Sequence, residues 1–280
     1  MQLTKEKNIV IQNSDTRNFL ADAFYPPEKK ELPLVIFAHG YKGYKDWGAW
    51  DLMGEKIAEA GYFFVKFNFS HNGTTVEQPR EFADLEAFGH NNFSREMSDY
   101  DAVLNHFATH PAVDEEKVAL IGHSRGGGIS VIKASEDDRV KLLISLAGVS
   151  NFRYRFPSQQ RFDDWKESGV MYSENKRTGQ QMPHYFQFFQ DFEENEKRFD
   201  IQYAAQHLEK PFLIIQGTDD DAVKDKESLL LHEWSKNSTL EMIQAANHTF
   251  GASEPWKEKR LPEWLDKATE FAIDFMKLNL

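Results

Sequence analysis

Short runs of apolar residues that do not alternate with polar ones recur along the chain. Such runs are typical of strands in a parallel sheet that helices cover on both faces. Two further runs near the N-terminus resemble an antiparallel pair of edge strands, and one more run lies near residue 240. The predicted strands are Asn8–Ile11, Phe19–Tyr25, Leu34–Ala38, Phe63–Phe69, Val118–Ile121, Leu142–Leu146, Phe212–Ile215 and Thr239–Ala245.

Between most of these runs, apolar residues recur at the spacing of one helix face. We predict a helix from Trp50 onward, a second that follows a Ser94 cap and ends before Pro111, and a last one with Pro262 in its first turn. Strands that alternate with helices predict an α/β fold. We therefore expect a mostly parallel central sheet of about eight strands, flanked by helices.

One segment interrupts the alternation. Residues 151–200 contain twelve aromatic side chains mixed with many charges, and they follow the predicted strand Leu142–Leu146. An insert of this length is usually a functional lid or a disordered excursion, and its aromatic content is too high for disorder. We predict a helical lid, without strands of its own, at 151–208. It separates two parts of the core at 1–150 and 209–280.

A candidate nucleophile lies between a predicted strand and a helix. Gly122-His123-Ser124-Arg125-Gly126 directly follows the apolar run Val118–Ile121. Gly-x-Ser-x-Gly at a strand-to-helix junction is typical of a nucleophile elbow, where small neighbours permit a strained turn at the serine. A serine hydroxyl needs a base to take its proton, and a carboxylate must orient that base.

Two later loops supply these groups at the carboxyl ends of strands. Asp219, Asp220 and Asp221 follow the strand Phe212–Ile215, and His248 follows the last predicted strand. The chain order serine, aspartate, histidine is the order of α/β-hydrolases. For the oxyanion, backbone N–H groups are expected from Arg125 and from Tyr41, which follows the strand Leu34–Ala38. His39 and His123 are expected to support these loops.

The chain resembles the α/β-hydrolase superfamily from Leu34 to Leu280. Within it, the chain is similar to esterases of the dienelactone-hydrolase and cinnamoyl/feruloyl-esterase kind. This resemblance rests on the motifs His39-Gly40, Gly122–Gly127 and His248. The resemblance implies Gly217-x-x-Asp220-x-x-Val223 as the acid loop, with Asp220 preferred over Asp219 and Asp221. Arg125 departs from the pattern because many of these esterases have glutamine there. Dienelactone hydrolases usually have a cysteine where this chain has Ser124.

Composition excludes several classes. The formal net charge is −12, which argues against nucleic acid or an anionic membrane as partner, and the chain has no cysteine. No apolar run approaches a membrane span and no signal peptide is evident, so we expect a cytoplasmic location. We expect no cofactor and no metal. His106 and His110 have the spacing of a metal pair but lack a third ligand, and they are expected on the surface.

These observations predict a serine hydrolase that cleaves carboxylic esters through an acyl-serine. The expected substrate is a small, neutral or weakly charged ester with an aromatic or medium-length part. Two alternatives stay open: a peptidase or amidase of the prolyl-oligopeptidase or aminopeptidase type, and a ligand-binding protein without turnover. Acyl transfer to an acceptor other than water is a further variant. A homodimer is an open possibility.

Aromatic residues near the candidate site are expected to contact the substrate. Aromatic clusters in a lid also pack the lid's own core, so only some of them can serve this role. The predicted substrate-binding residues are Tyr44, Trp47, Phe152, Tyr185 and Phe189.

Overall fold

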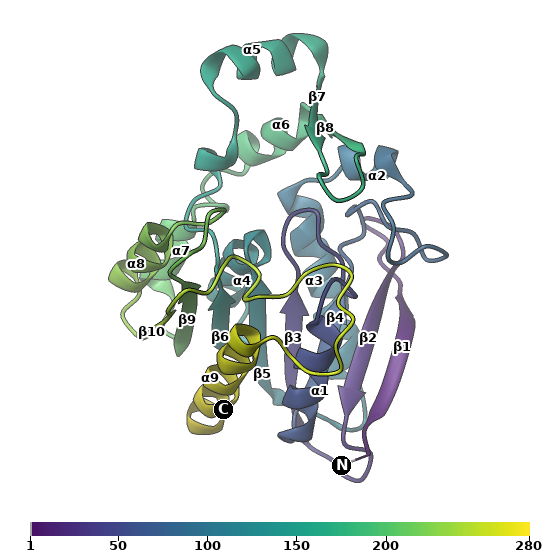
Figure 1. Ribbon diagram of the computed structural model, residues 1–280, viewed down its shortest axis with the longest axis vertical. Coiled ribbons are helices and arrows are strands. Elements are labelled where there is room, and N and C mark those ends of the chain that lie inside the picture. Colours follow the sequence, from purple (N-terminus) through teal and green to yellow (C-terminus); the bar gives the residue numbers. More distant parts are fainter. Residues whose placement is uncertain (1) are drawn as a thin grey trace.

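An eight-stranded sheet forms the centre of the computed structural model, which describes residues 2–280 (Figure 1). The strand order is β1-β2-β4-β3-β5-β6-β9-β10. β1 and β2 pair antiparallel, as do β2 and β4, and the other neighbours are parallel. The predicted strands and the predicted antiparallel edge pair are confirmed. The strands are β1 Thr4–Ile11, β2 Phe19–Tyr25, β3 Leu32–Ala38, β4 Phe63–Phe67, β5 Val113–His123, β6 Val140–Leu146, β9 Phe212–Gly217 and β10 Ser238–Ile243.

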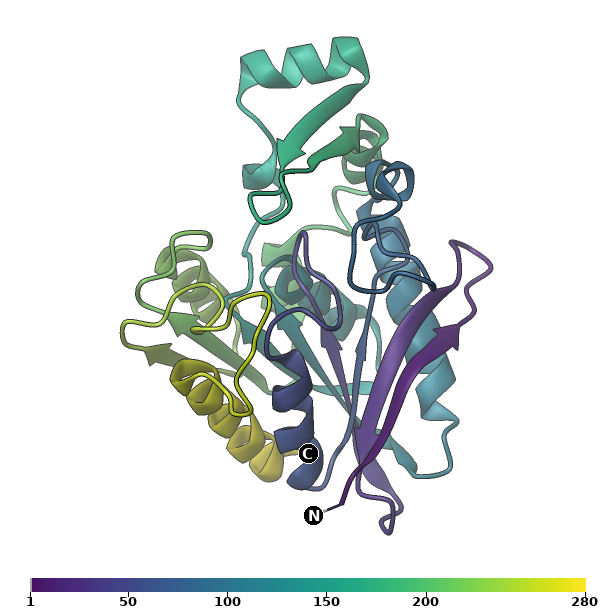
Figure 2. The same ribbon diagram turned by 45° about the vertical axis from the view of Figure 1, so that its right-hand side comes forward.

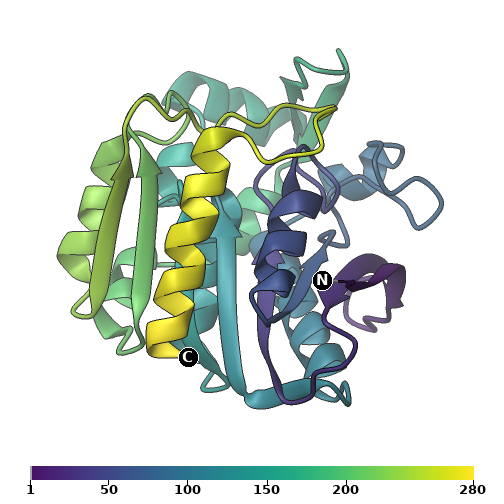
Figure 3. The same ribbon diagram turned by 60° about the horizontal axis from the view of Figure 1, so that its bottom comes forward.

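Helices cover both faces of this sheet, as the pattern predicted. Figure 3 shows α1 and α9 in front of the strands; α3, α4, α7 and α8 pack into the apolar cluster on the other face. In residues 2–280 no helix combines the length and the apolar character that crossing a bilayer requires. The helices are α1 Trp50–Glu59, α2 Leu85–Gly89, α3 Phe93–Ala108, α4 Arg125–Glu136, α5 Gln159–Ser168, α6 Gln187–Glu194, α7 Ile201–His207, α8 Asp225–Trp234 and α9 Glu263–Asn279, with a 3-10 turn at Arg153–Arg155.

The apolar runs of the central strands place buried side chains on both faces of the sheet. In β3, Leu34, Ile36 and Ala38 enter the cluster under α3 and α4. Val35 and Phe37, which alternate with them, enter the cluster under α1 and α9. Successive side chains of a strand point to opposite faces, so a strand between two helical layers must be apolar at every position.

Two helix starts differ from their expected details. The cap of α3 is Asn92, whose side chain accepts the Arg95 N–H, so the expected Ser94 cap was wrong. Asparagine is as good a cap as serine, and its extended backbone places it just before the first helical turn. In α9 the helix begins at Glu263 and Pro262 is the cap residue rather than part of the first turn.

The insert between β6 and β9 is not purely helical. It contains a two-stranded antiparallel hairpin, β7 Val170–Glu174 and β8 Gln181–Tyr185, beside helices α5, α6 and α7. Figure 2 shows the hairpin and α5 beyond the ends of the central strands. The expectation of no strand here was wrong because each hairpin strand has only five residues and the apolar residues of β7, Val170, Met171 and Tyr172, are adjacent and do not alternate with polar ones. The division at 151–208 stays a prediction.

Candidate active site

Ser124 lies at a sharp turn between β5 and α4. Its backbone has φ 56° and ψ −121°, a region that residues other than glycine rarely adopt and that costs about 1–3 kcal/mol. Close packing maintains the turn. A Cβ at Gly122 would lie 2.4 Å from the Gly126 carbonyl oxygen, and one at Gly126 would lie 2.5 Å from the carbonyl oxygens of Ala38 and His39. The glycines of the predicted elbow are therefore required by contact.

The three predicted members of the triad converge at the carboxyl ends of β5, β9 and β10. His248 Nε2 lies 3.0 Å from Ser124 Oγ, and His248 Nδ1 lies 2.8 Å from Asp220 Oδ2. Ser124 and His248 both line a cavity, whereas Asp220 is buried behind the imidazole. An ionised Asp220 only accepts, so the Nδ1–H donates to it and Nε2 is left to accept the serine proton.

The structure selects Asp220 from the three consecutive acids. Its Oδ1 accepts the N–H groups of Ala222 and Val223, both at 2.8 Å, and its Oδ2 accepts Gln216 Nε2 at 3.2 Å. Burial alone raises the pKa of Asp220, but the hydrogen bond and charge of His248 and the two backbone N–H groups outweigh it and lower the pKa below its usual value. Asp219 and Asp221 are exposed.

The two predicted oxyanion donors flank the serine. Arg125 is the first residue of α4, where a backbone N–H has no partner within the helix. Tyr41 follows His39 and Gly40 after β3. Close contact between Gly126 and the carbonyl oxygens before this loop places the loop beside the start of α4. Within residues 2–280 neither N–H donates a hydrogen bond, so both are free to bind an oxygen.

His39 and His123 support the loops, as expected. His123 Nε2–H donates to the His248 carbonyl oxygen at 2.9 Å. His39 donates from Nδ1 to the Gly40 carbonyl oxygen at 2.9 Å, and its Nε2 accepts the Phe69 N–H at 3.3 Å. Burial lowers the pKa of His39 to about 4 and that of His123 to about 3, with the nearby His248 adding to the second shift. Both rings are neutral supports.

The side chain of Arg125 takes part in an ion pair that the sequence did not reveal. Its Nη2 donates to Glu96 Oε1 at 2.6 Å, and Glu96 is fully buried in α3. The guanidinium lies over the Tyr41 ring, 5.1 Å from its centroid. Burial raises the pKa of Glu96, and the positive charge of Arg125 opposes that rise. Only the packing of α3 against α4 brings these two charges together.

The hairpin of the insert contacts the loop that carries Tyr41. Tyr41 Oη lies 2.6 Å from His184 Nε2 in β8. Lys42 Nζ donates to Ser173 Oγ and to the Glu174 carbonyl oxygen, both at 2.7 Å, in β7. Burial lowers the pKa of His184 to about 3, and the charges of Arg125 and Lys42 add to that effect. The insert therefore closes one side of the space above Ser124.

Two cavities meet at Ser124, Tyr41 and His248. The larger, of about 540 Å³, lies under the insert, and the smaller, of about 210 Å³, lies toward Trp47 and Trp50. Of the predicted substrate-binding residues, Phe152 lines the larger cavity and Trp47 the smaller. Residues that the sequence did not single out also line the larger cavity: Phe93, Arg155, Phe156, Arg161, Trp165, Met171, His184 and Phe188.

Tyr44, Tyr185 and Phe189 line neither cavity, so their predicted contact with substrate was wrong. Tyr44 is 1% exposed and packs with Phe82. Tyr185 turns outward, where its hydroxyl donates to Glu86 at 2.5 Å. Phe189 packs against Phe156 and Phe162 inside the insert. Aromatic residues that share a segment cannot be sorted by sequence into those facing the cavity and those facing the core.

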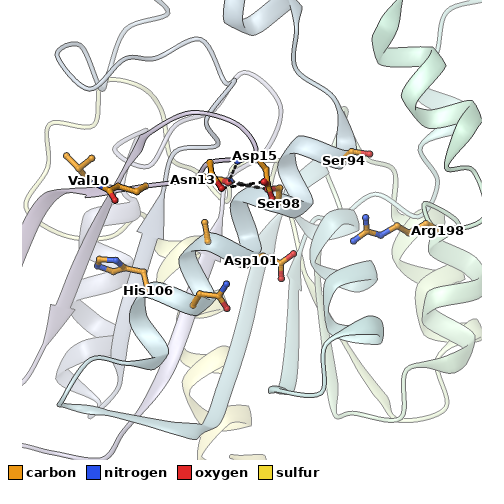
Figure 4. Close-up of a pocket in the computed structure, with 12 residues that line it drawn as sticks. Val10, Asn13, Asp15, Ser94, Ser98, Asp101, His106 and Arg198 are labelled. Atoms are coloured by element: carbon orange, nitrogen blue, oxygen red, sulfur yellow. Dashed lines mark hydrogen bonds between the residues drawn. The ribbon is translucent and has the colours of Figure 1, made fainter.

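A larger cavity, of about 750 Å³, lies away from Ser124 between the loop after β1 and α3 (Figure 4). Figure 4 shows Asn13, Asp15 and Ser98 linked by hydrogen bonds on one side of it, and Ser94 and Arg198 on another. No nucleophile is paired with a base among the residues that line it, which include His106 but not His110. Size alone therefore does not locate the chemistry of this protein.

Comparison with known families gives one match that spans most of the chain. Residues 55–276 match the family described as the prolyl oligopeptidase family. That range contains Ser124, Asp220 and His248 together with the whole insert.

The matches to individual relatives cover less than half of this chain and less than half of each relative. The quorum-quenching protein AidA of Acinetobacter baumannii is 24% identical over 122 residues, which are 44% of this chain and 37% of that protein. Cutinase 1 of Thermobifida cellulosilytica is 28% identical over 129 residues, which are 44% of this chain and 42% of the cutinase. The chain spans about half or less of the length of the relatives that it matches.

Solved structures share the fold over nearly the whole chain. Est1E from Butyrivibrio proteoclasticus with bound ferulic acid has a TM-score of 0.75 and 17% identity, and the match covers 97% of this chain and 98% of that one. A hydrolase from Agrobacterium vitis has a TM-score of 0.72 and 20% identity, covering 99% of this chain and 100% of that one. The predicted α/β-hydrolase fold is confirmed.

Proposed function

We propose that this chain, which belongs to the prolyl oligopeptidase family, is a serine hydrolase of carboxylic esters. The observation that carries the proposal is the relay from Ser124 through His248 to Asp220, with hydrogen-bond distances of 3.0 and 2.8 Å at the floor of a cavity. The name of the cutinase relative supports ester cleavage, as does the ferulic acid bound in Est1E.

The reaction proceeds in two halves. His248 Nε2 accepts the proton of Ser124 Oγ while that oxygen bonds to the ester carbonyl carbon. The N–H groups of Tyr41 and Arg125 stabilise the resulting oxyanion, and each such donor typically contributes about 2.7–4 kcal/mol. His248 then gives its proton to the leaving alcohol oxygen as the carbon–oxygen bond breaks. A water molecule, activated by His248, releases the acid from Ser124 in the same way.

The lining of the cavity favours esters over peptides with a free amino terminus. Recognition of a substrate ammonium group requires a carboxylate, which Glu193, Glu194 or Glu196 of the insert could supply if it faced the cavity. None of the three lines the cavity at Ser124, and Glu196 pairs with Arg153 at 2.6 Å. Among the described residues that do line this cavity there is no aspartate or glutamate. The peptidase alternative is therefore the less favoured one.

The decisive experiment compares the wild type with Ser124→Ala on 4-nitrophenyl esters of increasing acyl length and, in parallel, on aminoacyl 4-nitroanilides. We expect ester cleavage in the wild type and a loss on the order of 10⁴-fold or more in Ser124→Ala, because the oxyanion donors alone give only residual catalysis. Ser135→Ala is the matched control, since Ser135 lies at the far end of α4. It should retain wild-type activity.

Each rival has its own outcome. Faster cleavage of the anilides would establish the peptidase alternative. Saturable binding of esters without turnover, and without labelling of Ser124 by a fluorophosphonate, would establish a ligand-binding protein. Ester cleavage at the wild-type rate by Ser124→Ala would refute the mechanism. The cytoplasmic location, the homodimer and the absence of nucleic-acid and membrane partners stay predictions.

A further inference from the structure

The larger cavity at Ser124 has an uneven distribution of charge. Much of its wall is apolar, with Phe152, Trp165 and Phe188 among its residues. Three arginines also line it, Arg125, Arg155 and Arg161, and no carboxylate does so in the described part of the chain. The whole chain carries a formal net charge of −12. In the described part of the chain, the ionised side chains that line this cavity are therefore positive, whereas the molecule as a whole is negatively charged.

Two of these arginines already have acidic partners behind the wall. Arg125 pairs with the buried Glu96 at 2.6 Å. Arg155 pairs with Glu227 and also donates to the Ala222 carbonyl oxygen at 3.2 Å. Each of these pairs is close to electrically neutral, although guanidinium groups keep further N–H donors for a ligand.

Arg161 differs from the other two. It lies in the first turn of α5 in the insert, and within residues 2–280 it has neither an ion pair nor a hydrogen bond from its side chain. The other titratable groups of the wall do not compensate it. His184 is neutral because burial and neighbouring cations lower its pKa to about 3, and the imidazole of His248 faces Ser124 and Asp220. Among the described residues, the exposed Arg161 is therefore the arginine of this cavity that has no acidic partner.

Resting on the proposed function, we infer that this cavity takes the part of the ester that carries an apolar body ending in a carboxylate, and that Arg161 pairs with that carboxylate. The aromatic wall removes the apolar body from water. A guanidinium matches a carboxylate in a planar, two-pronged geometry, and such charge-assisted pairs are stronger than neutral hydrogen bonds. This inference narrows the expectation of a neutral or weakly charged ester to an ester with one carboxylate.

Pairs of esters that differ only in charge test the inference. The charged members are the mono-4-nitrophenyl esters of glutaric, adipic and suberic acid, and each neutral partner is the same molecule with its free carboxylate capped as a methyl ester. A second pair, 4-carboxyphenyl hexanoate and its methyl ester, places the charge on the alcohol side. The readout is kcat/KM, measured at 0.05 M and at 0.5 M NaCl.

We expect the wild type to prefer the charged member of at least one pair, despite the negative charge of the protein. Arg161→Gln should lower the ratio of charged to neutral kcat/KM by about tenfold, the effect of one charge-assisted contact. High salt should reduce the wild-type preference, because salt screens a partly exposed charge pair. Arg153→Gln is the matched control, since Arg153 pairs with Glu196 outside this cavity and should leave the ratio unchanged.

The outcomes separate this inference from the proposed function. If the capped esters are cleaved by Ser124 but no pair shows a preference that depends on Arg161, the inference is overturned and the esterase proposal stands. If no ester of either kind is cleaved, the esterase proposal fails. Binding of monomethyl suberate to Ser124→Ala, measured by calorimetry, then still tests the cavity: Arg161→Gln added to that variant must weaken binding about tenfold, and an equal Kd overturns the inference.

Discussion

At the scale of single residues, the position of His248 depends on the groups that hydrogen-bond to it. His248 is held from two sides: Asp220 accepts its Nδ1–H, and His123 donates to its carbonyl oxygen. Asp220 is itself held by the N–H groups of Ala222 and Val223. The imidazole therefore has one orientation and one tautomer before any substrate arrives, which is the arrangement that a general base requires.

Asp220→Asn tests this arrangement. An amide at this position can donate to Nδ1, which favours the tautomer with a proton on Nε2 and leaves no acceptor for the Ser124 proton. We expect kcat for 4-nitrophenyl esters to fall by about 10³ to 10⁴-fold at neutral pH with little change in stability. Asp221→Asn is the control, because that side chain is fully exposed and pairs with Lys224 rather than with His248. A loss of less than tenfold in Asp220→Asn would contradict the assigned role.

At the scale of secondary-structure elements, buried charge connects the N-terminal strands to the loop before α1. Asp22 in β2 is fully buried and accepts Lys45 Nζ at 2.7 Å, Lys66 Nζ at 2.6 Å and Lys7 Nζ at 2.7 Å. Asp46 and Asp51 complete the cluster. The three carboxylates converge as metal ligands would, but the lysine ammonium groups lie among them. We interpret the cluster as an ion-pair network that fixes β1, β2 and β4.

Asp22→Asn should destabilise the fold strongly. Lys45 and Lys66 have no exposed side-chain surface, so the substitution leaves buried ammonium groups with too little negative charge. We expect a loss of about 3–5 kcal/mol in the free energy of unfolding, measured by urea denaturation. Asp51→Asn, at a side chain that is 45% exposed, should cost about 1 kcal/mol or less. Equal losses in the two variants would show that burial does not control the network.

At the scale of the whole molecule, buried neutral histidines couple stability to pH. The pKa values of His39 and His71 are lowered to about 4, and those of His123 and His184 to about 3, in each case chiefly by burial. In the unfolded chain these groups titrate near 6.5. Between these values the unfolded chain binds more protons than the folded one, so the stability present above pH 6.5 is lost as the pH falls.

Buried acids act in the opposite direction. Burial raises the pKa of Asp99 to about 7, so Asp99 binds a proton in the folded state that the unfolded chain would release, and the raised pKa of Glu96 acts in the same direction. On unfolding, the two acids release protons and the four histidines take them up. The net uptake on unfolding below pH 6.5 is therefore positive, and acid should destabilise the protein.

We expect the free energy of unfolding to decrease from pH 7 to pH 5, by at most about 1.4 kcal/mol per pH unit for each extra proton that the unfolded chain binds. Denaturant titrations at pH 7, 6 and 5 measure this. Acid also reduces the net charge of −12 and thereby the self-repulsion of the chain, which would stabilise it. A constant or rising stability toward pH 5 would contradict this prediction, because proton uptake by the histidines on unfolding would then not be the dominant effect.

Local patterns in the sequence determined the elements and the chemistry. Uninterrupted apolar runs predicted the central strands because both faces of the sheet are covered, and the elbow around Ser124 could be predicted because its glycines follow one another in the chain. The order of Ser124, the acid loop and His248 placed all three groups at the ends of parallel strands. A parallel sheet brings such ends to one edge, so their convergence followed from topology.

Only the tertiary structure decided which side chains of a segment face the site. The family resemblance favoured Asp220 over Asp219 and Asp221, but only the structure shows the backbone N–H groups of Ala222 and Val223 that hold the Asp220 carboxylate toward His248. The aromatic residues of the insert divide between its own core and the cavity: Phe189 packs against Phe162, whereas Phe188 lines the cavity. The pairing of Arg125 with Glu96 and the place of Arg161 in the cavity wall likewise depend on packing between elements distant in sequence. The periodicity of apolar residues predicts which face of an element is buried, but it does not predict which residues pack against that face.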